Sequence, residues 1–170
     1  MKSKTLRLAG KDQPDNAPVL DNRRARYEYE IMDTVVAGIA LTGTEIKSLR
    51  TGAGASINEA YVRIRDGEAW LVSMTIPMYK QGSFSNHEPN RARKLLMHRE
   101  QIDRFAVRLS EKGLTVVALR LFFTDPGTPG HKPGVAKVLL GLARGKKLWD
   151  KRKATQERDV KRELARLARR

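Results

Sequence analysis

Three histidines, 19 carboxylates and no cysteine are the side chains in this sequence that could hold a metal ion or move a proton. His87, His98 and His131 share no metal-ligand spacing with one another or with a carboxylate, so we expect no metal site and interpret them as surface or loop residues. The carboxylates are scattered among basic residues, which leaves no pair for acid–base catalysis. The sequence therefore favours a binding protein over an enzyme, and one that needs no cofactor.

A basic segment near the end of the sequence, GLARGKK, superficially resembles a phosphate-binding loop. Only three residues separate Gly141 from Gly145, and no Ser or Thr follows the lysines, so the Walker A motif is absent. The Gly-x-Ser-x-Gly motif of a hydrolase nucleophile is absent too. We expect a flexible basic exit from the last strand, and a nuclease would need a metal or acid–base cluster that we cannot find.

Positive charge is the strongest chemical signal in the sequence. The formal net charge is +15 and the sequence pI is near 10.5, and residues 144–170 alone hold 12 Lys or Arg against 4 Asp or Glu. This balance predicts RNA, DNA or a ribosome-like assembly as partner, with an anionic membrane surface as the rival. No stretch approaches the roughly 18 apolar residues of a spanning helix, and residues 1–16 lack the apolar run of a signal peptide, so we expect a cytoplasmic protein without membrane contact.

The basic residues form four concentrations along the chain: residues 22–26, Lys47 with Arg50, residues 90–94, and the segment 144–170. One such cluster is usually only a solvated surface. Four of them favour contact with RNA or DNA, because segments that are distant in sequence can meet as one patch in the fold.

The segment 144–170 has the features of a tail that becomes ordered on binding. Val160, Leu164 and Leu167 form an apolar stripe that is too narrow to dock firmly on a folded core. We therefore expect a basic tail that is disordered when free and helical on a partner, with a simple solubility tag as the alternative.

Periodicity and turn signals indicate the elements that must position these residues. Residues 1–21 show no sustained periodicity, which is typical of a flexible arm. Alternating apolar residues predict two paired strands at 27–32 and 35–41. Thr42 precedes Glu45 by three residues, the spacing of a capping box, and so predicts the start of a short helix.

Turns organise the rest of the chain. Asp66 and Gly67 predict a two-residue hairpin turn, and Gly113 follows a helical pattern at 99–112 where a helix-ending glycine belongs. Three further strands are predicted at 93–98, 114–123 and 135–143, with loops at 80–90 and 124–134. About seven strands with two or three helices indicate a mainly β fold with some α, a small antiparallel OB-like barrel over residues 22–143.

Five motifs that occur in order between Asn22 and Arg152 resemble the successive motifs of the SsrA-binding protein family, also called small protein B. They are NRRARYEYEI, AGIALTGTEIKSLR, DGEAWL, NHEPNRARKLLMHREQIDR and GLARGKKLWDKR. The resemblance implies an OB-like barrel without catalytic activity that binds transfer-messenger RNA (tmRNA) and helps it to rescue bacterial ribosomes stalled on messages without a stop codon.

The same resemblance implies how the partners are arranged. The barrel would hold the elbow of the tRNA-like domain of tmRNA. The tail would enter the empty message channel of the small ribosomal subunit, against its rRNA and near the decoding centre. Elongation factor Tu would join the delivery complex, and the chain would be a monomer when bound to RNA. The alternative is a general rRNA-binding or ribosomal protein with an OB-like barrel.

Family positions implicated in RNA binding match Asn22 and Leu96, with phosphate contacts beside them at Arg24, Arg26, Lys47, Arg50 and Lys94. The family's tail motif matches Gly145, Lys146, Lys147, Asp150, Lys151 and Arg152, and Trp149 between them could stack on an unpaired base or cover the end of the last strand. Two further alternatives stay open. Asn22 can hydrogen-bond RNA or cap its own turn, and Leu96 can contact RNA or belong to the core.

Three positions depart from the family pattern. Val36 stands where the family often has Glu in an RNA-contacting region, so a polar contact there is lost or replaced. The loop at 124–134 is longer than the usual turn, and Trp149 replaces a Tyr or His, which keeps a stacking ring but changes its hydrogen bonding.

Overall fold

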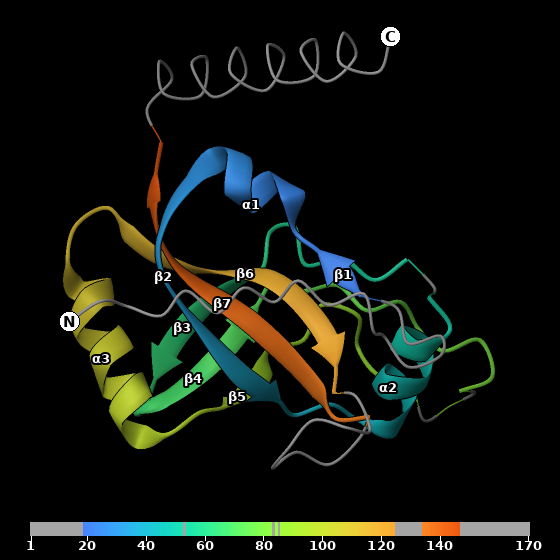
Figure 1. Cartoon of the computed structure of the whole chain (residues 1–170). Helices are drawn as coiled ribbons and strands as arrows, with labels where there is room; N and C mark the ends of the chain where they lie inside the picture. Colours follow the sequence, from blue (N-terminus) through green and yellow to red (C-terminus); the bar gives the residue numbers. More distant parts are fainter. Residues whose placement is uncertain (1–18, 53, 83, 85, 125–133, 147–170) are drawn as a thin grey trace, which may run out of the picture.

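The computed structural model describes residues 19–52, 54–82, 84, 86–124 and 134–146 (Figure 1). In chain order, the elements are β1 (Leu20–Asp21), α1 (Arg23–Glu28), β2 (Tyr29–Ile39), α2 (Gly43–Arg50), β3 (Tyr61–Arg65), β4 (Glu68–Val72), β5 (Arg93–Leu96), α3 (Arg99–Ser110), β6 (Leu114–Phe123) and β7 (Ala136–Gly145).

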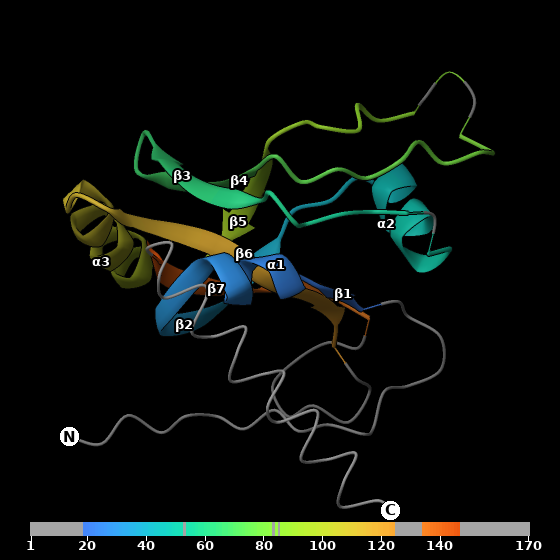
Figure 2. The ribbon, with the colours of Figure 1, turned by 90° about the horizontal axis from the view of Figure 1, so that it is seen from above.

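The strands form one antiparallel sheet in the order β1-β6-β3-β4-β5-β2-β7, and a further pairing of β6 with β7 closes it into an uneven ring. Seen from above, β3 and β4 lie on one side of this barrel and β2 and β7 on the other, while α2 and α3 lie near opposite ends (Figure 2). The prediction of a mainly β antiparallel barrel with two or three helices is therefore confirmed.

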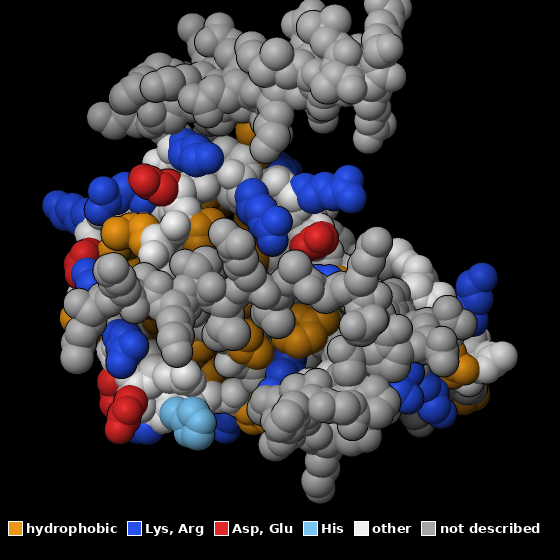
Figure 3. All heavy atoms as spheres, viewed as in Figure 1, with side chains coloured by type: hydrophobic (Ala, Val, Ile, Leu, Met, Phe, Trp, Pro, Cys, Tyr) orange, Lys and Arg blue, Asp and Glu red, His pale blue; other side chains and the backbone are white. Residues whose placement is uncertain are grey.

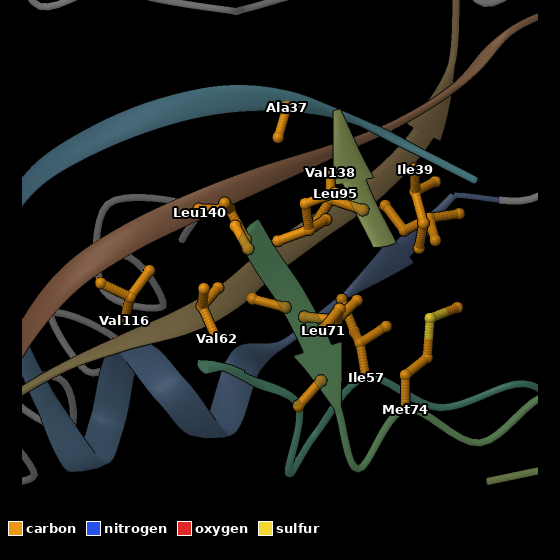
Figure 4. Close-up of a cluster of buried hydrophobic side chains, with 14 of the residues drawn as sticks. Ala37, Ile39, Ile57, Val62, Leu71, Met74, Leu95, Val116, Val138 and Leu140 are labelled. Carbon is orange, nitrogen blue, oxygen red and sulfur yellow. The ribbon is translucent and has the colours of Figure 1, made fainter. Parts of the chain in front are cut away.

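Alternation along the strands fills the barrel with apolar side chains. Ala37 and Ile39 of β2, Val138 and Leu140 of β7, and Leu95 of β5 point into one cluster (Figure 4). Each fully buried Val, Leu or Ile side chain contributes about 1.5 to 3 kcal/mol to the free energy of unfolding. A smaller cluster on the outer side of β6 and β7 is covered by Ala25 of α1.

Elements with local sequence signals lie where they were predicted. The Thr42 backbone N–H donates to the carboxylate of Glu45 over 2.7 Å at the start of α2. Asp66 and Gly67 both have positive φ, 53° and 71°, in the turn between β3 and β4. Gly113 has a φ of 83° just beyond α3, a conformation that favours glycine.

Residues 27–41 do not form the two paired strands that were predicted. Residues 23–28 are the helix α1, and residues 29–39 are the single long strand β2, which continues across the expected turn with a bulge between Ile31 and Asp33. β2 stays extended because it pairs along its length with β7, a partner that no local pattern shows. Because one strand replaces two, the predicted number of seven strands is reached only with β1, which was not predicted. β1 begins two residues before the expected start of the barrel.

A buried ion pair joins α2 to β5. The side chains of Glu45 and Arg93 are both fully buried, with Arg93 Nε donating to Glu45 Oε1 over 2.9 Å. Arg91 donates to the same carboxylate from the rim. The remaining nitrogens of Arg93 donate to the carbonyl oxygens of Met74, Pro89 and Arg91. Two buried charges are thus compensated by hydrogen bonds to nearly every polar atom they carry.

Burial by itself raises the pKa of Glu45. The hydrogen bonds from Arg91 and from the Thr42 backbone, together with the positive charges of Arg93 and Arg91, outweigh burial and hold that pKa below its ordinary value. The carboxylate therefore stays ionised in the folded chain, where it is the counter-charge of Arg93.

Replacing Glu45 by Gln should lower the free energy of unfolding at neutral pH by about 3 to 5 kcal/mol, because Arg93 is left buried without its counter-charge. Urea unfolding of the full chain measures this loss. The matched control is Asp103→Asn, which breaks the exposed Arg99–Asp103 ion pair and should cost less than about 1 kcal/mol.

Wild type and Glu45→Gln also test how the free energy of unfolding depends on pH. Since the pKa of Glu45 is lowered on folding, its contribution is present above the unfolded carboxyl value of about 4.3 and is lost as the pH falls through the folded value. The difference between wild type and Glu45→Gln should shrink in acid. A difference that stays constant with pH would contradict this account.

Candidate nucleic-acid interface

Leu96 lies on the outside of the barrel. In β5 the side chains of Arg93 and Leu95 point inward, at 0% and 2% exposure, whereas Leu96 is 57% exposed. It pairs with Gly38 of β2, and a Cβ atom on that glycine would lie 3.2 Å from Leu96 Cβ. Glycine at position 38 leaves room for the leucine side chain to lie across β2. Leu96 therefore does not belong to the core.

Lys94 is the next outward-facing residue of β5, and its ammonium pairs with Glu68 of β4 in a half-exposed ion pair. Both lie in an open hollow with a volume of about 730 Å³, whose lining also includes Leu96, Val36 and Lys137. Val36, the departure from the family pattern, is 40% exposed there. The lining thus combines exposed apolar side chains with lysines, and it also contains the carboxylates of Asp66 and Glu68. Apolar side chains suit contact with ribose and bases, and lysines suit contact with phosphates.

Arg24 and Arg26 are both exposed on α1. Arg24 already has two carboxylate neighbours, Glu28 at 2.7 Å and Glu59 at 3.6 Å, so part of its charge is neutralised within the chain. Lys146 donates to the carbonyl oxygen of Arg26. Figure 3 shows Lys and Arg side chains gathered over this helix at the top of the molecule.

Lys47 and Arg50 are exposed on α2 and lie over aromatic rings. The Lys47 ammonium is 5.8 Å from the centre of the Tyr79 ring, and the Arg50 guanidinium is 5.7 Å from that of Phe123. These contacts fix the long side chains without neutralising their charge, so both remain available to an anion. The predicted phosphate contacts are therefore carried by three separate elements, α1, α2 and β5.

The basic cluster at 90–94 is only partly a surface feature. Arg93 is fully buried and Arg91 is bound to Glu45, so Lys94 is the member of this cluster that faces the hollow. Counting charges along the sequence cannot show this, because the partner carboxylate is more than forty residues away. Alternation in RARKLL, with Arg93 in phase with Leu95, is the signal that could have revealed it.

Asn22 is buried, with 2% of its surface exposed. Its Oδ1 accepts from the Ala25 N–H over 2.8 Å, and its Nδ2 lies within 2.9 to 3.2 Å of the carbonyl oxygens of Ile57, Asn58 and Ala118. Of the two alternatives, the cap describes this geometry. Asn22 begins α1 and joins it to β6 and to the loop before β3.

The tail motif begins inside the sheet. Gly145 is the last residue of β7 and pairs with Tyr29, and the Lys146 backbone N–H donates to the Glu28 carbonyl over 2.9 Å. The other residues predicted for the tail, Lys147, Trp149, Asp150, Lys151 and Arg152, lie outside the described residues.

His87 differs from the prediction of a surface or loop residue in one respect. It lies in the loop between β4 and β5 but is only 7% exposed, with its ring nitrogens 3.0 Å from Thr44 Oγ1 and 3.1 Å from the Ile76 carbonyl oxygen. In the described part of the chain, no group of three or more His, Asp or Glu side chains could hold a metal ion. None of the helices described there is long and apolar enough to span a membrane.

Replacing Asn22 by Ala should lower the free energy of unfolding by roughly 1 to 3 kcal/mol, because one backbone N–H and three carbonyl groups lose a buried partner. Asn22→Asp keeps the cap but sets a carboxylate against three carbonyl oxygens, so it should destabilise at least as much. Thermal unfolding measures both. An unchanged melting temperature for Asn22→Ala would show that the amide is not structural.

Comparisons with known proteins agree with the resemblance in the sequence motifs. The sequence profile described as SmpB protein matches residues 19–170. The SsrA-binding protein of Bradyrhizobium sp. (strain ORS 278) is 46% identical over 162 residues, which cover 95% of this chain and 98% of the relative. That of Salinispora arenicola (strain CNS-205) is 50% identical over 150 residues, covering 88% and 89%.

A solved structure described as "tmRNA-SmpB: a journey to the center of the bacterial ribosome" matches the fold with a TM-score of 0.62 at 48% identity, covering 78% of this chain and 87% of that chain. With both the sequence profile and close relatives spanning nearly its whole length, this chain belongs to the SmpB protein family.

Proposed function

We propose that this chain binds tmRNA and acts with it on stalled ribosomes in trans-translation, as a binding factor without catalytic activity. The observation that carries the proposal is the match, at 48% identity, to a structure described as tmRNA and SmpB in the bacterial ribosome. The SsrA-binding relatives at 46% to 50% identity support the same assignment, and the net charge of +15 suits a protein enclosed by RNA.

The hollow around Leu96 and Lys94 is the proposed centre of the tmRNA contact. An aliphatic side chain that is more than half exposed on a sheet face is free to pack against a ribose or a base. The adjacent Lys94, which pairs with Glu68 in the free chain, would exchange that partner for a phosphate. Arg26 of α1 and Lys47 and Arg50 of α2 extend the same function as phosphate contacts. Asn22 contributes by holding α1 in place.

The proposed division of labour follows the sheet. The barrel, which ends with β7 at Gly145, holds the tRNA-like domain of tmRNA, and the tail beyond Lys146 reads the empty message channel of the ribosome. Placement of the junction motif GKKLWDKR, residues 145–152, is what the ribosome senses, more than the total charge of the tail. Elongation factor Tu is the third partner of the delivery complex.

Replacing Leu96 by Ala should weaken tmRNA binding about tenfold, since a leucine buried against RNA contributes on the order of 1.5 kcal/mol. The melting temperature should stay unchanged because the side chain is largely exposed in the free chain. Val107→Ala is the matched control: it removes a 66% exposed apolar side chain from α3 and should bind tmRNA like wild type. Equal binding by wild type and Leu96→Ala would remove Leu96 from the interface.

Replacing Asp150, Lys151 and Arg152 together by Ala removes two cations and one anion, so binding to isolated tmRNA should barely change. Tagging of a nascent peptide on a ribosome stalled without a stop codon should nevertheless fail. The control exchanges Glu157, Asp159 and Glu163 for Gln, which raises the charge of the tail but spares the junction, and should leave tagging largely intact. Normal tagging by the triple-Ala protein would reduce the tail to an electrostatic anchor.

A general rRNA-binding protein would behave differently in the same binding assay. It would bind several structured RNAs about as tightly as tmRNA, whereas the proposed factor should prefer tmRNA.

A further inference from the structure

The connection between β4 and β5 presents apolar side chains to solvent next to α2. In residues 78–82, 84 and 86, hereafter the braced loop, Met78 is 57% exposed and Phe84 is fully exposed. A single exposed apolar residue needs no explanation. Here the exposed residues lie beside a group of hydrogen bonds that joins Tyr79, Gly82 and Asn86.

An asparagine side chain closes the braced loop. Asn86 Oδ1 accepts from the backbone N–H of Tyr79 over 3.1 Å, and Asn86 Nδ2 donates to the Tyr79 carbonyl over 2.8 Å. The Gly82 N–H donates to the same carbonyl over 2.8 Å, and a Cβ atom on Gly82 would lie 2.9 Å from Asn86 Cγ. Tyr79, Gly82 and Asn86 are therefore held together by hydrogen bonds within the loop itself, a feature of compact surface loops that often bind partners.

The root of the braced loop is fixed to the barrel. His87, the residue after Asn86, is buried between Thr44 of α2 and the Ile76 carbonyl. The loop lies beside α2 in both views (Figures 1 and 2), and the Lys47 ammonium of that helix lies over the Tyr79 ring. Loop and helix thus form one surface.

The chemistry of this surface is aromatic and cationic. The braced loop carries Lys80, which is exposed, and no acidic residue occurs in its sequence from Met78 to Asn86. Lys47 adds a second positive charge from α2. Aromatic rings beside lysines are the combination that binds unpaired nucleotides, because a ring stacks on any base while the cations neutralise the flanking phosphates.

We propose that the braced loop is a base-stacking element, in which Phe84 stacks on an unpaired base of tmRNA while Lys47 and Lys80 neutralise the phosphates on either side. The inference rests on the proposed function and extends it. It assigns the loop to tmRNA and not to ribosomal RNA because Tyr79 of the loop lies against Lys47, a proposed tmRNA contact of α2.

Three full-length variants test stacking at Phe84. Phe84→Ala and Phe84→Leu should each weaken binding to tmRNA about tenfold, the order of one lost base stack, and Phe84→Trp should bind like wild type. All three should keep the wild-type melting temperature, since the ring is fully exposed. The salt dependence of binding should be unchanged in Phe84→Ala, whereas Lys47→Gln should lower the slope of log affinity against log salt by about 0.7 to 0.9.

A fourth variant tests the brace. Asn86→Ala leaves Phe84 in place but removes the bonds that shape the loop, so tmRNA binding should weaken severalfold, because an unshaped loop must be ordered at the moment of binding. Val107→Ala again serves as the exposed apolar control.

Several outcomes would overturn the proposal. Wild-type affinity in Phe84→Ala removes the ring from the interface. Wild-type affinity in Phe84→Leu would show that residue 84 makes a simple apolar contact and does not stack on a base. If Phe84→Ala binds tmRNA normally but loses binding to the ribosome, the loop contacts ribosomal RNA and not tmRNA. A wild-type chain that does not bind tmRNA overturns the proposed function itself, which separates that failure from a failure of the loop.

Discussion

The fold depends on one carboxylate in its interior. Glu45 caps the start of α2 through the Thr42 backbone and neutralises Arg93 of β5, so a charge that would be costly alone becomes a joint between a helix and a strand. Arg93 in turn binds three carbonyl oxygens around the connection from β4 to β5. These bonds fix β5, which carries Lys94 and Leu96, and both ends of the connection that contains the braced loop.

The same constraint explains why charge counting overstates the RNA surface. RARKLL contributes three cations in sequence, but strand alternation turns Arg93 into the core, and Arg91 is held at the rim by Glu45. Lys94 remains to face outward beside Leu96. A net charge of +15 predicts a polyanionic partner correctly as a class, yet it does not tell which cations build the protein and which meet the partner.

Local signals predicted the elements that local interactions determine. The capping box of α2, the Asp66-Gly67 turn and the glycine after α3 are each fixed within a few residues. Residues 27–41 were misassigned because pairing of β2 with the distant β7 overrides the expected turn. The buried positions of Asn22, Arg93 and His87 depend on partners from elsewhere in the chain, although the helix cap that Asn22 forms with Ala25 is local. For Leu96, the family resemblance implied a contact with RNA and left a core position open, and the structure places the side chain outside the core.

The closure of the ring also sets the order in which the protein can be completed. Among the described residues β7 is the last strand, and it pairs with both β2 and β6, bringing Gly145 opposite Tyr29 near the start of the barrel. Such distant pairings make folding slow compared with helical proteins of similar size. A chain interrupted before β7 leaves the long edges of β2 and β6 unpaired, and open strand edges are sites of aggregation. An incomplete copy of this protein therefore exposes edges at which chains can aggregate, and these edges are covered once β7 has paired with β2 and β6.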